Sequence, residues 1–125
     1  MKTRAAIAAV GLAVTSLFFI DLCNFIFDCG CASLWAGADA HCNIHTAATR
    51  HCPVCSHGVA GYAVTYAAIV LPQLAAAFLM RRGSWLPRLA LVLALFPLAG
   101  AAVMSVAAWV DGYPIHGVVL RHKLY

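Results

Sequence analysis

The sequence contains little charge and no glutamate. Only 10% of its 125 residues are charged, against about 25% in a typical soluble domain. It has no glycine-rich phosphate loop, no serine in the strand-turn-helix context of hydrolases and no acid or base series for ion transport. These absences argue against a hydrolase, a kinase and a proton-coupled carrier.

Long apolar blocks make up most of the chain, which is 64% hydrophobic. A bilayer core of about 30 Å needs roughly 20 apolar residues in a helix, and three stretches qualify: 5–27, 59–80 and 85–110. Pro72 and Pro97 fall inside two of them, where neighbouring helices can compensate for the lost hydrogen bonds. We therefore expect an all-α integral membrane protein, a single domain over 1–125, with three transmembrane helices.

The basic residues predict the orientation of these spans, because basic residues beside cytoplasmic ends are retained during insertion. Five lie on one side and three on the other: Lys2, Arg4, Arg81, Arg82 and Arg88 against Arg50, Arg121 and Lys123. The amino terminus is thus expected in the cytoplasm, with 28–58 as an extracytoplasmic loop and 111–125 as an extracytoplasmic tail. The first apolar run is longer than the core of a signal peptide, so we expect an uncleaved anchor. The alanine-rich composition favours a bacterial inner membrane.

Partners follow from the same features. The net charge of +4 is scattered and forms no basic stripe with interleaved aromatic residues, so nucleic acid is not expected. The lipid bilayer is the expected surrounding. Small residues at Gly58 and Gly61 and over 99–102 permit close helix packing, which favours other membrane subunits or a homo-oligomer as partners.

The loop over 28–58 concentrates the chemistry, with five of the six cysteines and four of the six histidines. Thiols and imidazoles clustered in this way indicate metal binding, thiol redox chemistry or disulfide cross-linking. By contrast, His57 alone is read as a solvated residue. Asp21 and Cys23, near the outer end of the first span, are interpreted as an interfacial and a packing residue, although an ionisable residue there is also a functional candidate.

A metal site is the preferred interpretation of the loop. A short helix over about 40–51 would place Cys42, His45 and Cys52 on one face. With Cys55 they form the preferred ligand set, two pairs that each have a two-residue gap, as in tetrahedral zinc sites. The secondary candidates are Cys29, Cys31, His41 and His51. Zinc is the first expectation, with copper or iron next, in an accessory or metal-handling subunit of a larger membrane complex.

A membrane thiol-disulfide oxidoreductase is the alternative, based on the sequence Cys52-Pro53-Val54-Cys55. Pro53 suits the first position of a helix and Cys52 its cap, where the helix dipole favours the reactive thiolate. Cys52 would then attack and Cys55 would resolve. The motif, with Cys29 and Cys31 as a shuttle pair, resembles the arrangement in the vitamin K epoxide reductase and disulfide-forming quinone reductase families. Those families hold a quinone in a four-helix bundle, whereas three spans are expected here.

A purely structural subunit is the third possibility. In an oxidising compartment the same cysteines would pair, and each disulfide would stabilise the loop by about 2 to 4 kcal/mol. Disulfides alone leave the histidines without a role, which is why the metal site is preferred.

Overall fold

The computed structural model describes residues 1–37 and 51–113. Its elements are α1 (Lys2–Phe27), the 3₁₀ turn η1 (Leu34–Ala36), the single-turn α2 (Pro53–Ser56), α3 (Gly58–Leu79) and α4 (Trp85–Asp111). No strand occurs among these described residues. The all-α prediction is therefore confirmed over that part of the chain.

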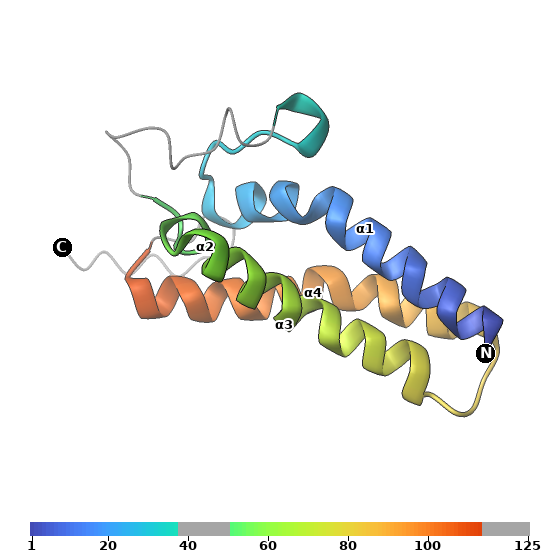
Figure 1. The fold of residues 1–125 in the computed structure, drawn as a ribbon. Coiled ribbons are helices and arrows are strands. Elements are labelled where there is room, and N and C mark those ends of the chain that lie inside the picture. The colour runs from blue at the N-terminus through green and yellow to red at the C-terminus, as the bar shows by residue number, and fades with distance from the viewer. Residues whose placement is uncertain (38–50, 114–125) are drawn as a thin grey trace.

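The three long helices match the three predicted spans. All of them are long and apolar enough to cross a membrane, and their ends lie within three residues of the predicted limits. Pro72 and Pro97 lie inside α3 and α4 as predicted. Each long helix packs against the other two, so they form the elongated three-helix bundle of Figure 1.

The two ends of the bundle carry different features. The amino terminus and the connection between α3 and α4 lie at one end, whereas η1, α2 and the end of α4 gather toward the other (Figure 1). At the first end, Arg4 donates to the carbonyl of Phe78 at 3.1 Å and Arg88 donates to that of Met80 at 2.7 Å. These bonds satisfy carbonyls that the end of α3 leaves without helical partners.

A buried polar contact joins the three helices near the middle of the bundle. The Thr15 hydroxyl donates to Gln73 at 2.8 Å, and the Gln73 amide donates to the backbone carbonyl of Val92 at 3.0 Å. Gly11 allows this close approach, since a Cβ there would lie 2.5 Å from Val92 Cγ1. Both polar ends of Gln73 are therefore satisfied in an apolar surrounding, as burial requires.

Candidate four-thiol site

Cys29 and Cys31 are positioned by a tight turn at the outer end of α1. The helix stops because Asp28 adopts the left-handed conformation, with φ 49°, and its N–H bonds to the carbonyl of Asn24 at 2.8 Å. Gly30 has φ 76°, a region that glycine enters without strain. Its N–H donates to the Asn24 side chain at 2.8 Å, so Asn24 fixes the turn that carries both thiols.

Cys52 and Cys55 are positioned by α2. Cys52 is the N-cap and Pro53 occupies the start of the helix, as the sequence predicted. The Cys52 sulfur accepts the backbone N–H of Cys55 at 3.4 Å. The single turn of α2 packs tightly on the start of α3, because a Cβ on Gly61 would lie 2.4 Å from the carbonyl oxygen of Val54.

The two cysteine pairs meet in one buried apolar cluster at the outer end of the bundle. Cys29 and Cys31 are 8% and 5% exposed, and Cys52 and Cys55 are 0% and 2% exposed. Their side chains form a row of hydrogen-bonded neighbours, from Cys31 through Cys29 and Cys52 to Cys55. No disulfide joins any two of the five cysteines that the structure describes: Cys23, Cys29, Cys31, Cys52 and Cys55.

The row polarises its two central thiols in opposite directions. Hydrogen bonds from the Cys29 and Cys55 side chains lower the pKa of Cys52 to about 4, in spite of its burial. At Cys29 the hydrogen bond with Cys31 lowers the pKa, but the bond to Cys52 and burial outweigh it, and the pKa rises to about 11. The two pKa values favour a thiolate at Cys52 and a protonated thiol at Cys29, whose sulfur lies 4.0 Å from the Asn24 side-chain oxygen as its hydrogen-bond donor.

Aromatic rings enclose this row. The Tyr62 hydroxyl lies 3.5 Å from the Cys55 sulfur, and the Tyr62 ring packs on Phe19 with centroids 5.8 Å apart. Tyr113 packs edge to face on Phe27 at 5.5 Å. Burial is the main cause that raises the pKa of the Tyr113 phenol, and the charges at Cys52 and Cys29 contribute less. The phenol is therefore a hydrogen-bond donor at neutral pH.

Asp21 lies beside this region and contacts the segment that follows the turn. The Ser33 hydroxyl donates to one Asp21 oxygen at 2.6 Å, and the other oxygen is buried without a hydrogen-bond partner. Trp35 of η1 packs edge to face on Phe18, with centroids 5.6 Å apart. The chain after Cys31 therefore folds back along the flank of α1.

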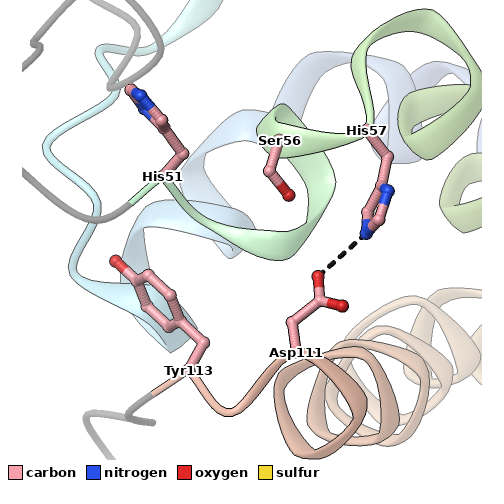
Figure 2. A pocket seen from close by; sticks show the side chains of 5 residues that line it. All are labelled: His51, Ser56, His57, Asp111 and Tyr113. Carbon is pink, nitrogen blue, oxygen red and sulfur yellow. Dashed lines mark hydrogen bonds and ion pairs between the residues drawn. The ribbon is translucent and has the colours of Figure 1, made fainter.

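An open recess lies next to the thiols, at the ends of α2, α3 and α4. Figure 2 shows five side chains around a common space of about 430 Å³: His51, Ser56, His57, Asp111 and Tyr113. His57 contacts a carboxylate oxygen of Asp111 at 2.9 Å. The His57 side chain is 60% exposed, as expected of a solvated histidine, and it has Asp111 as a partner.

The described residues include only part of the predicted metal-ligand set. Cys42, His45 and His41 lie outside the described residues, as does most of the helix predicted over 40–51. His51 lines the recess, and the other two secondary candidates, Cys29 and Cys31, meet Cys52 and Cys55. Within residues 1–37 and 51–113, no group of three or more histidine, cysteine or acidic side chains is arranged to hold a metal ion.

Sequence reasoning did not identify Asn24, Tyr62 or the contact between His57 and Asp111. An asparagine three residues before the end of a predicted span is the one signal that could have pointed to Asn24, because asparagine side chains commonly bond to nearby backbone N–H groups. Comparison with known proteins adds no further residue: no protein-family model, curated protein or solved structure matches the chain.

Proposed function

We propose that this chain is a multi-pass membrane protein that performs thiol-disulfide exchange through its four-thiol site. The observation that carries the proposal is the burial of two sequence-distant cysteine pairs in one cluster, where the neighbouring thiols lower the pKa of Cys52 and favour its thiolate. Thiolates are the nucleophiles of disulfide exchange. The buried cluster supplies the two cysteine pairs that an internal exchange step requires.

The exchange step follows the order of the contacts. When Cys29 and Cys31 are joined as a disulfide, Cys29 has no proton to donate, and the Cys55 side chain and backbone N–H are the groups that stabilise the Cys52 thiolate. That thiolate attacks the Cys29 sulfur, and the Cys31 sulfur leaves with the electron pair of the broken bond. Cys55, as its thiolate, then attacks the Cys52 sulfur and releases Cys29. Two electrons thus pass from the pair Cys52 and Cys55 to the pair Cys29 and Cys31. Extracytoplasmic dithiols reduce the first pair again, and extracytoplasmic disulfides oxidise the second.

The proposal places the site outside the cytoplasm of a bacterial inner membrane. Support comes from the bundle, which brings the amino terminus, with Lys2 and Arg4, to the same end as the connection that contains Arg81 and Arg82 (Figure 1). Basic residues gathered at one end mark the cytoplasmic side. The lipid bilayer surrounds the long helices, and a second subunit, of another kind or of the same chain, packs against their small residues.

The test is to trap the exchange intermediate in the full-length protein. Cys55→Ala removes the resolving thiol, so after mild oxidation we expect a disulfide between Cys29 and Cys52 with Cys31 free, detected by non-reducing peptide mapping. Cys23→Ala is the matched control, because it also removes a buried thiol but leaves all four members of the row. Failure to find the link from Cys29 to Cys52, with thiols that resist alkylation before and after reduction, would remove the basis for exchange.

Metal binding remains the second candidate, since one observation favours it. Four soft ligands with paired short gaps converge in a buried cluster, and Cys42 and His45 add donors from the same loop. In this function Cys52 and Cys55 bind zinc, or copper or iron, with Cys42 and His45 or with Cys29 and Cys31, in a metal-handling subunit of a larger complex. Elemental analysis of protein purified without chelator or reductant decides: one metal per chain with about four free thiols would replace the exchange proposal.

The disulfide-linked structural subunit has less support, because no disulfide joins the cysteines in the part of the chain that the structure describes.

A further inference from the structure

The recess of Figure 2 lies directly beside the four-thiol site but belongs to neither cysteine pair. Two of its residues, His51 and Ser56, are the immediate neighbours of Cys52 and Cys55 in the chain. A third, Tyr113, packs with the apolar cluster that contains all four thiols. A molecule bound in this recess would therefore contact the residues that flank Cys52 and Cys55 in the chain.

Burial of the sulfurs limits what can react with them. Because Cys52 is 0% exposed and Cys55 is 2% exposed, a flat protein surface cannot bring a disulfide into contact with either. A single cysteine side chain is narrow enough to enter after a small local opening. A space of about 430 Å³ is within the range of ligand pockets, and it suits a short stretch of peptide rather than a folded domain.

The walls of the recess offer the hydrogen bonds that a peptide backbone needs. His57 uses one oxygen of Asp111, which leaves the second oxygen to accept an N–H. The Ser56 hydroxyl donates to the Pro53 carbonyl at 3.3 Å, so its oxygen is also available as an acceptor. The Tyr113 hydroxyl supplies a donor for a carbonyl.

The walls are also held in place before any ligand binds. The pair of His57 and Asp111 joins the start of α3 to the end of α4. Tyr113 is fixed by its ring contact with Phe27 and by its N–H, which donates to the Ala108 carbonyl at 2.8 Å. Preformed walls reduce the entropy that binding must overcome.

We propose that this recess binds the cysteine-containing peptide with which the four-thiol site exchanges, and this inference rests on the proposed function. The ligand chemistry is a cysteinyl residue flanked by peptide bonds. Its source is either a small peptide thiol or an extended cysteine-containing segment of an extracytoplasmic protein. When Cys52 and Cys55 are joined as a disulfide, the ligand thiolate attacks the Cys52 sulfur and the Cys55 sulfur leaves with the electron pair of the broken bond. A second ligand thiolate then attacks the ligand sulfur and releases Cys52, so the ligand leaves as a disulfide and the pair is reduced.

The probe for the first source is S-methylglutathione, a tripeptide whose blocked sulfur cannot exchange. Its binding to the full-length protein in lipid nanodiscs is measured by calorimetry. We expect the double variant Ser56→Ala/Tyr113→Phe to bind at least tenfold more weakly, because it removes one acceptor and one donor while retaining the ring. The matched control is Tyr66→Phe, whose hydroxyl instead contacts Ser16 at 2.7 Å within the bundle and whose loss should leave the affinity unchanged.

The second source is tested with a ten-residue extended peptide that has one S-methylcysteine at its centre. Binding of this peptide but not of the tripeptide, with the same loss in the double variant, assigns the recess to a protein segment. Binding of neither probe, or equal binding to wild type and the double variant, would overturn the inference. Because neither probe can exchange, this result is independent of the disulfide trapped in Cys55→Ala, and the two proposals fail separately.

Discussion

The reactivity of Cys52 should respond to the loss of Cys29, because the Cys29 thiol is the main donor that stabilises the Cys52 thiolate. With its pKa lowered to about 4, Cys52 at pH 5 is about 90% thiolate, against about 0.03% for an ordinary thiol with a pKa near 8.5. The thiolate populations thus differ about 3,000-fold. A less basic thiolate is also a weaker nucleophile, by about 100-fold over this pKa difference. The net advantage at pH 5 is about 30-fold.

The assay follows alkylation of Cys52 by iodoacetamide from pH 4 to 9, residue by residue, by peptide mass spectrometry. Burial slows the reaction at every pH by the same factor, so the shape of the profile is the measurement. In the wild type we expect a rise near pH 4 and a plateau above pH 5. In Cys29→Ala we expect the rise to move to higher pH, with up to about 30-fold slower alkylation at pH 5 if the pKa returns fully to its ordinary value.

Cys23→Ala is the control for the loss of a buried thiol, and its profile should match the wild type. The reasoning is refuted if Cys52 of the wild type reacts about tenfold faster per pH unit between pH 6 and 8, as an ordinary thiol does. It is also refuted if Cys29→Ala leaves the midpoint of the rise unchanged, because Cys29 would then not be the donor.

Two further predictions concern stability. The folded pKa of Cys52 lies below its ordinary value, so the contribution of Cys52 to stability is full above about pH 9 and is lost as the pH falls toward 4. The pKa of Cys29 is raised to about 11, so the contribution of Cys29 to stability is full below about pH 9 and is lost as the pH rises through 11. Unfolding in mixed micelles should therefore show greatest stability near pH 9, and the rise from pH 5 to 9 should disappear in Cys52→Ala. Gln73→Leu should lower the free energy of unfolding by about 1 kcal/mol, because Thr15 and the Val92 carbonyl lose their hydrogen-bond partner. Equal stability of Gln73→Leu and the wild type in the same titration would contradict this prediction.

The long helices could be predicted from the sequence because long apolar runs are recognised from composition alone. An apolar run of more than 20 residues is long enough for a membrane-spanning helix and too long for a spanning strand. The predicted limits of 5–27, 59–80 and 85–110 accordingly differ little from those of α1, α3 and α4. The cap at Cys52 was also accessible, since Pro53 can occupy a first helical position without losing a hydrogen bond.

The meeting of the two cysteine pairs could not be predicted with the same ease. It depends on Asn24, whose side chain fixes the turn after α1, and on the tight contact that Gly61 allows between α2 and α3. Neither residue is part of a cysteine motif, and the two pairs are 20 residues apart in sequence at their nearest members, Cys31 and Cys52. Spacing alone therefore favoured the nearer Cys42 and His45 as partners. The polar contacts of Gln73 were missed because a single glutamine in an apolar run has no periodic signal.

Exchange and metal binding make opposite demands on the same sulfurs. A four-thiolate site for zinc needs every ligand deprotonated, whereas the described arrangement keeps Cys29 protonated by placing it beside the charge on Cys52. A bound cation would displace the thiol protons and replace the hydrogen bonds of the row with metal–sulfur bonds. Because Cys52 could then no longer attack a disulfide, a metal ion in the row would inhibit exchange.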